Sequence, residues 1–144
     1  MQAKILSLCL FFSLVYSAAL FAQSSPVGTW RTVDDETGKS KSHLEIFEKD
    51  GRYHGKIVKL LDNEPDAVCK ECPGDKKDKP LMGMEILWNL ESYKDYWSYG
   101  RIMDPNNGKT YKCSVWLEDA NTLKVRGYIG ISALGRNQKW YRVN

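Results

Sequence analysis

Hydrophobic and polar residues alternate along most of the chain beyond residue 26, with the period of two that is typical of half-buried β-strands. Tyr111, Cys113 and Val115, for example, fall on one face of such a run. Turn residues separate the runs, and Asp50-Gly51 is a strong signal for a tight hairpin. The pattern predicts strands over about 27–33, 42–48, 52–61, 84–88, 97–103, 109–118, 123–131 and 138–143.

Two segments are harder to assign from this pattern. Residues 84–88 would also suit a short helix, because Met84, Leu87 and Trp88 follow a helical spacing as well. Residues 62–80 are polar, contain three prolines and many charges, and are predicted to form a long loop.

Glycines lie inside or beside several predicted strands, at Gly55, Gly100, Gly127 and Gly130. Glycine weakens a regular strand, so these positions indicate bulges and sharp bends. A sheet that bends repeatedly can lose its exposed edges by closing on itself. We therefore expect an all-β fold, a single antiparallel barrel of about eight strands, in preference to an open sandwich.

The first 22 residues have the features of an export signal. Lys4 precedes a mainly apolar run over residues 5–14, and small residues follow near Ala18, Ala19 and Ala22. We expect cleavage after Ala22, or after Ala19, which leaves a single domain over residues 23–144 in the periplasm or outside the cell. The rest of the chain has no second long apolar run, so we expect no membrane span.

Charge argues against one large class of function. Without Lys4 the chain carries 20 basic and 18 acidic side chains, a formal balance of +2. A nucleic-acid-binding protein would show a clustered basic excess, so no nucleic-acid partner is expected. The length suits one modest hydrophobic core, and we expect a monomer.

Motifs near both ends of the domain resemble those of known barrels. Gly28-x-Trp30 in the first strand and Trp140-Tyr141-Arg142 in the last resemble the arrangement in lipocalins and related calycin-type barrels, where a basic residue packs on the Trp. The whole domain resembles a secreted bacterial family, domain of unknown function 2147. That resemblance implies export and a lipocalin-like barrel, and it brings no catalytic residues. It rests on Gly28-x-Trp30, Thr37-Gly38-Lys39, Gly55-Lys56-Ile57, Cys69-x-x-Cys72-x-Gly74, Pro80-Leu81-x-Gly83-Met84, Asp104-Pro105-x-x-Gly108-Lys109-x-Tyr111, Arg126-Gly127-Tyr128-x-Gly130 and Leu134-Gly135-Arg136-x-Gln138-x-Trp140.

Cys69 and Cys72 form the sharpest local motif. A structural disulfide is the preferred interpretation in an exported protein. Thiol exchange is less favoured because Pro73 and Gly74 follow directly, without a strand-to-helix turn. A zinc site is a third alternative, but no second pair of Cys or His ligands lies at a spacing typical of zinc sites, so no metal or cofactor is expected. Cys113 is read as a buried thiol.

Candidate binding residues come from the aromatic and basic positions of the first and closing strands. An inward guanidinium needs a partner, so Arg126 and Arg136 are either structural or anion-binding. Aromatic rings could line a pocket or simply fill the core. The predicted ligand contacts are Trp30, Arg126, Tyr128, Arg136 and Trp140. Arg142 is expected to stack on Trp30 as a latch, and Asp104 to shape a turn.

Three functions remain open at this stage. The first is an exported barrel that binds a small amphipathic or anionic molecule. The second is an interaction module that presents the loop over residues 62–80 to an envelope protein. The third and least favoured is a hydrolase or isomerase using Asp104 or Tyr128 with an arginine, since no recognised catalytic motif supports it.

Overall fold

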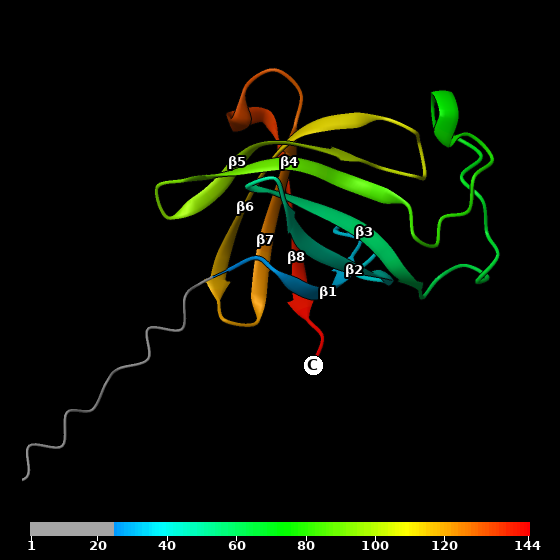
Figure 1. Ribbon diagram of the computed structural model, residues 1–144, viewed down its shortest axis with the longest axis horizontal. Helices are drawn as coiled ribbons and strands as arrows, with labels where there is room; N and C mark the ends of the chain where they lie inside the picture. Colours follow the sequence, from blue (N-terminus) through cyan, green and yellow to red (C-terminus); the bar gives the residue numbers. More distant parts are fainter. Residues whose placement is uncertain (1–24) are drawn as a thin grey trace, which may run out of the picture.

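The computed structural model describes residues 25–144, so the expected leader, with its cleavage site, lies outside the described residues. Eight antiparallel strands form a closed barrel in which each strand pairs with its sequence neighbours and β1 pairs with β8 (Figure 1). The predicted barrel of about eight strands is confirmed. The strands are β1 (Gly28–Val33), β2 (Ser40–Lys49), β3 (Arg52–Leu60), β4 (Glu85–Tyr93), β5 (Tyr96–Met103), β6 (Thr110–Asp119), β7 (Thr122–Tyr128) and β8 (Arg136–Arg142).

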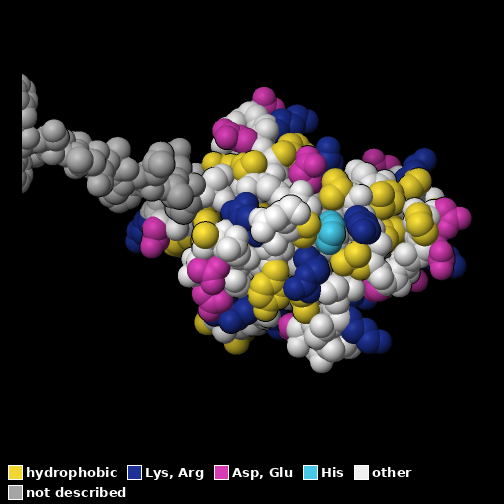
Figure 2. All heavy atoms as spheres, turned by 90° about the horizontal axis from the view of Figure 1, so that it is seen from below, with side chains coloured by type: hydrophobic (Ala, Val, Ile, Leu, Met, Phe, Trp, Pro, Cys, Tyr) yellow, Lys and Arg dark blue, Asp and Glu magenta, His cyan; other side chains and the backbone are white. Residues whose placement is uncertain are grey.

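Period-two alternation places the core inside this barrel. Leu44 and Ile46 of β2, Val115 of β6 and Leu123 of β7 point inward and are almost completely buried. Lys, Arg, Asp and Glu side chains are mixed on the outer face seen from below (Figure 2). No helix among residues 25–144 is long and apolar enough to cross a membrane.

The segment that could have been a short helix is the strand β4. Its helix-like spacing arises from a bulge. Leu87 and Leu90 of β4 pair with Gly55 and Tyr53 of β3, so β4 has one more residue than β3 between these two pairs. Asn89, inside the bulge, has a φ of 61°. The extra residue returns both leucines to the core, where each is fully buried.

Gly100 is needed at the facing irregularity in β5. A Cβ atom on Gly100 would lie 2.6 Å from Cδ2 of Leu90, which is too close for any real contact. The β5–β6 register shifts just before it, between Trp97 and Gly100. Glycine here lets the barrel bend while Leu90 fills the space that a side chain would take.

β7 is shorter than predicted, because it ends at Tyr128 instead of Ile131. Gly130 has a φ of 77°, which turns the chain out of the strand and into the 3₁₀-helix η2 (Ser132–Leu134). Ile129, inside the predicted strand 123–131, lies instead in the β7–β8 loop and is 68% exposed.

The barrel closes where β1 meets β8 at the Trp30–Arg142 and Arg31–Tyr141 pairs. The guanidinium of Arg142 lies 4.2 Å from the centre of the Trp30 ring. It also donates hydrogen bonds to the backbone oxygens of Ser25, Val27 and Ala120. This is the geometry expected of a latch across the seam.

The long segment between β3 and β4 lies against the barrel rather than extending freely. Cys69 and Cys72 form the expected disulfide, and both residues are buried. The short 3₁₀-helix η1 (Gly74–Lys76) follows, and a bridge between Val68 and Pro80 closes the loop. Figure 1 shows this segment, in green, beside one end of the barrel.

Candidate functional site

A cavity of about 520 Å³ opens at one end of the barrel. Residues from the β1–β2, β3–β4 and β5–β6 loops and from the start of β8 line its mouth, which places this mouth opposite the Trp30–Arg142 seam. A closed antiparallel sheet leaves such a space where its inward side chains do not meet across the axis.

The floor of the cavity is apolar. Inward positions of five strands supply Ile57, Ile86, Met103, Val125 and Trp140. All five are at most 7% exposed. A ligand body that contacts these side chains would be driven in mainly by removal of apolar surface from water.

A buried hydroxyl pair adds the first polar feature of the wall. Oγ1 of Thr32 and Oγ of Ser42 lie 2.8 Å apart and hydrogen-bond to each other. Thr32 Oγ1 also accepts a hydrogen bond from the backbone N–H of Ser42. Because these hydroxyls satisfy one another, the wall tolerates their burial without a ligand.

Two equivalent turns form opposite parts of the rim. In the β1–β2 turn the N–H of Gly38 donates to the carbonyl oxygen of Asp34, and in the β5–β6 turn the N–H of Gly108 donates to that of Asp104, each at 2.8 Å. The side chain of Asp34 accepts from Thr37, and these bonds lower the pKa of its carboxyl. Asp34 therefore stays ionised at neutral pH.

The rim is acidic. Among the cavity-lining residues, Asp34, Asp35, Glu36, Asp62 and Asp104 are acidic and only Lys41 and Arg136 are basic. Both cations are already paired, since Lys41 forms an ion pair with Asp62 and Arg136 forms ion pairs with Asp35 and Glu36. A ligand that reaches the rim therefore meets excess negative charge.

A chain of hydrogen bonds connects the floor to this rim. Nε1 of Trp140 donates to Gln138 at 3.0 Å, and the Gln138 amide donates to Asp35 at 3.3 Å. Asp35 also accepts two bonds from Arg136, at 3.1 and 2.7 Å, which raise the pKa of the guanidinium. The chain fixes the orientation of the Trp140 ring at the cavity wall.

Comparison with known proteins places this barrel in a family. Residues 28–142 match the family described as "Uncharacterized protein conserved in bacteria (DUF2147)". The chain belongs to this family. No curated protein matches it in sequence.

The DUF2147 barrel also has a solved structural neighbour. The chain is similar to a structure described as "Protein HP1028 from the human pathogen Helicobacter pylori belongs to the lipocalin family". The two share 22% sequence identity with a TM-score of 0.74, over 83% of this chain and 84% of the other. This likeness establishes the lipocalin-like fold.

Of the five predicted ligand contacts of this DUF2147 protein, two line the cavity and three lie elsewhere. Arg136 and Trp140 line the cavity. Trp30 is completely buried at the seam, where its Nε1 donates to the backbone oxygen of Pro26. Arg126 and Tyr128 lie on β7 at positions that alternate with the cavity-lining Val125 and Gly127, so both point outward.

Sequence reasoning missed the residues that join Arg136 to Trp140. Gln138 carries a usable signal, because it lies midway between the two on one face of a period-two strand. Asp35 carries no comparable signal, since its contact with Arg136 spans 101 positions of the sequence. Asp104 lines the mouth, and its Oδ1 accepts from the N–H of Asn106 in the turn.

Over the described residues 25–144, the cysteines and histidines do not gather at the cavity. The disulfide occupies the sulfurs of Cys69 and Cys72, which are then unavailable as thiolates or metal ligands. Cys113 is buried, and burial raises its pKa to about 12. Within residues 25–144, no group of three or more His, Cys, Asp or Glu side chains is placed to hold a metal ion.

Proposed function

We propose that this protein is an exported barrel that binds a small amphipathic molecule in its cavity. The observation that carries the proposal is the open cavity of about 520 Å³, which has an apolar floor and a polar rim. Specific sites for small molecules commonly have this volume and this division between apolar wall and few polar groups. Arg136, Gln138 and Trp140 are the proposed contacts between rim and floor.

The rim charges support a ligand whose polar end is neutral or cationic. An anionic end would have to displace Asp35 or Glu36 from Arg136 and would still face further carboxylates. That exchange gains little, because Arg136 already has its counter-ions. Trp30, Arg126 and Tyr128 are left out of the proposed site because the cavity wall does not include them.

Export is part of the same proposal. A leader over residues 1–22 and a mature single domain over residues 23–144 would deliver the barrel, as a monomer, to an oxidising compartment. The Cys69–Cys72 disulfide supports this, since such bonds persist outside the cytoplasm. Presentation of the 62–80 loop to a protein partner is less well supported, because Cys69, Cys72 and Leu81 of this region pack into the barrel core.

Two fluorescent probes with the same aromatic body test the proposal. N-phenyl-1-naphthylamine is neutral, and 8-anilino-1-naphthalenesulfonate adds an anionic sulfonate to the same rings. We expect the neutral probe to bind at one molecule per chain and the sulfonate to bind about tenfold more weakly, because of the acidic rim. Absence of saturable binding by either probe would contradict the proposal.

A matched pair of variants on β7 locates the bound probe. Gly127→Leu places a side chain in the cavity, where a Cβ atom meets only ordinary contacts of 3.5 Å and longer. We expect this plug to weaken binding at least tenfold. Tyr128→Leu adds a leucine to the outer face of the same strand and leaves affinity within about twofold. Equal affinity in wild type and Gly127→Leu would place the probe outside the cavity.

A further inference from the structure

The β7–β8 loop exposes an unusual amount of apolar surface. Ile129, Ile131 and Leu134 have exposed fractions of 68%, 63% and 78%. Among the described residues, no other large aliphatic residue is more than 42% exposed. These three side chains come from six consecutive positions beside the cavity mouth, since Gly127 and Arg136 at the two ends of the loop line the cavity. Clustered exposure of this kind marks an interaction surface.

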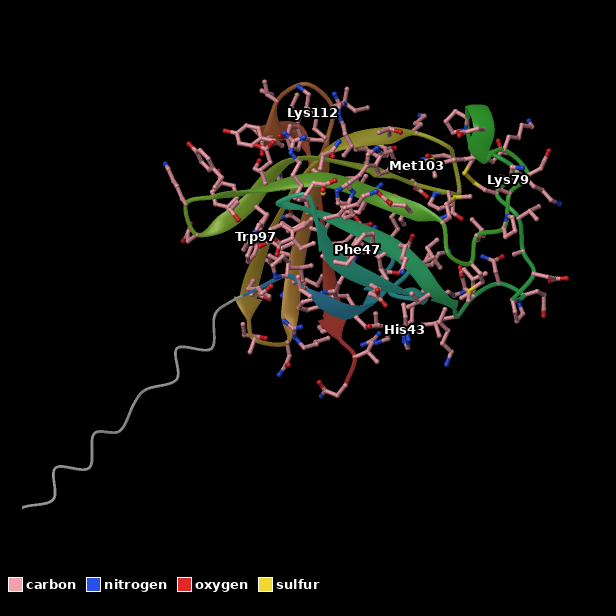
Figure 3. The ribbon with its side chains drawn as sticks, viewed as in Figure 1. His43, Phe47, Lys79, Trp97, Met103 and Lys112 are labelled. Atoms are coloured by element: carbon pink, nitrogen blue, oxygen red, sulfur yellow. A yellow bond between two sulfur atoms is a disulfide. The ribbon has the colours of Figure 1, made fainter. Side chains whose placement is uncertain are left out.

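Basic side chains lie directly beside this loop on the outer face. Arg101 of β5 pairs in register with Lys112 of β6, which pairs with Tyr128 of β7, so the three share one face. Nζ of Lys112 lies 3.4 Å from the carbonyl oxygen of Gly130 in the loop, and Figure 3 shows Lys112 beside it. Arg126, two residues before Tyr128, donates to the backbone oxygen of Ser132 at 2.7 Å.

These cations have no anionic partner among residues 25–144. None of Arg101, Lys112 and Arg126 has a carboxylate within 4.0 Å in the part of the chain that the structure describes. Arg126 instead holds the loop through Ser132 and contacts Asn137. The surface thus combines protruding aliphatic side chains, one tyrosine and uncompensated positive charge.

We propose that this surface, the apolar loop 129–134 with Arg101, Lys112, Arg126 and Tyr128, docks onto an anionic lipid bilayer. Aliphatic side chains at the tip would enter the interface between headgroups and acyl chains, while the cations behind them would meet lipid phosphates. Tyrosine is favoured at that boundary, because its ring is apolar and its hydroxyl is polar. The bilayer accounts for the apolar tip and the charge together.

The position of this surface would bring the cavity mouth to the membrane. Residues flanking the loop line the mouth, so docking places the opening beside the source of amphipathic molecules. The docking proposal does not depend on ligand binding. Lipid attachment is measured with the cavity plugged by Gly127→Leu, and probe binding is measured without vesicles, so each can fail alone.

Vesicle co-sedimentation tests the docking with the full chain. We expect binding to vesicles of phosphatidylglycerol and phosphatidylcholine, little binding to phosphatidylcholine alone, and weakening by 0.5 M NaCl. Ile131→Ser with Leu134→Ser should weaken binding at least tenfold, because both side chains lose their apolar insertion. Met82→Ser is the control, since Met82 is 39% exposed on another loop.

Charge variants test the second half of the surface. Arg101→Gln and Lys112→Gln should each weaken binding about fivefold, whereas Lys49→Gln, at the β2–β3 turn, should not change it. Absence of binding to the anionic vesicles, or binding that survives the paired serine change, would overturn the proposal. Self-association in sedimentation velocity that the serine pair abolishes would also overturn it, because a second copy would then cover the loop.

Discussion

At the closing seam, one guanidinium contacts an aromatic ring and three backbone oxygens. Arg142 stacks on Trp30 and donates to the carbonyl groups of Ser25, Val27 and Ala120. Gly28 leaves room for it, since a Cβ atom there would lie 2.6 Å from Nη1 of Arg142. The side chain therefore joins the N-terminal segment, β1 and the β6–β7 turn at one point.

Arg142→Ala should lower the free energy of unfolding by about 2 kcal/mol, because the ring contact and several charge-assisted hydrogen bonds are lost together. Urea unfolding measures this change. Arg52→Gln removes only an exposed ion pair with Glu91 and should change stability by less than about 0.5 kcal/mol. Similar losses in both variants would mean that Arg142 contributes only as a surface charge.

Burial of the Cys113 thiol should make the free energy of unfolding depend on pH. Burial raises the pKa of this thiol from 9.0 to about 12. Between these values the folded protein keeps the proton and the unfolded chain releases it, so the free energy of unfolding falls as pH rises above about 9. Urea unfolding at pH 8 and pH 10 should show a larger loss in wild type than in Cys113→Ala. Equal losses would show that the thiol does not contribute.

Burial should also protect the Cys113 thiol from modification by thiol reagents in the folded protein. In the mature domain over residues 23–144, with the disulfide intact, an aromatic disulfide reagent at pH 8 should modify Cys113 only as fast as the protein unfolds. Rapid modification of the native protein, at a rate independent of urea, would contradict the buried position.

At the scale of elements, the two rim turns share a backbone geometry but differ in their surroundings. Gly38 and Gly108 have φ values of 71° and 70°. A Cβ atom on Gly38 would meet nothing within 4 Å, whereas one on Gly108 would collide with the carbonyl of Glu71. The segment over residues 69–72, which the disulfide closes and which we call the disulfide segment, therefore packs directly on the β5–β6 turn.

Gly108→Ala should destabilise the protein by at least about 1 kcal/mol more than Gly38→Ala, because both carry the cost of positive φ but only Gly108→Ala displaces the disulfide segment. Urea unfolding compares the two. Trypsin should also cleave the chain just after this segment, at Lys76 or Lys77, faster in Gly108→Ala. Equal behaviour of the two variants would mean that the segment does not rest on this turn.

The elements also show what sequence patterns can and cannot predict. Period-two alternation predicted seven of the eight strands, because one face of each must be buried, and left residues 84–88 open between a strand and a short helix. The β4 bulge at Asn89 was missed, since it depends on a single positive φ. Gly130 was identified as a bend, but the strand was predicted to continue past it to Ile131, whereas β7 ends at Tyr128. Arg136 and Trp140 were identified as site candidates, but Asp35 joins them through a contact between β8 and a loop distant in sequence. Arg126 and Tyr128 alternate along β7 with the residues that line the cavity, and this alternate position alone makes their side chains face outward.

At the scale of the whole molecule, the barrel has its least backbone pairing at the seam between β1 and β8. The register of β1 with β8 contains two residue pairs, Trp30–Arg142 and Arg31–Tyr141, whereas the β2–β3 register extends from Ser42–Leu60 to Lys49–Arg52. Side chains supplement this short seam, through Arg142 on Trp30 and Arg31 at 5.0 Å from the Tyr141 ring. The barrel should therefore open locally at β1–β8 before it unfolds globally.

Native-state hydrogen exchange at low urea measures this opening. Amides of β1 and β8 should exchange through a smaller opening free energy than amides of β2 and β3, and Arg142→Ala should reduce that free energy further at the seam alone. Opening at the seam leaves the cavity mouth at the other end largely intact, so the neutral probe should leave the seam opening of β1 and β8 nearly unchanged and protect only the amides that exchange through global unfolding, such as those of β2 and β3. Uniform exchange across the barrel in the wild-type protein would show instead that the eight strands open as one unit, and that side-chain contacts fully compensate for the short register.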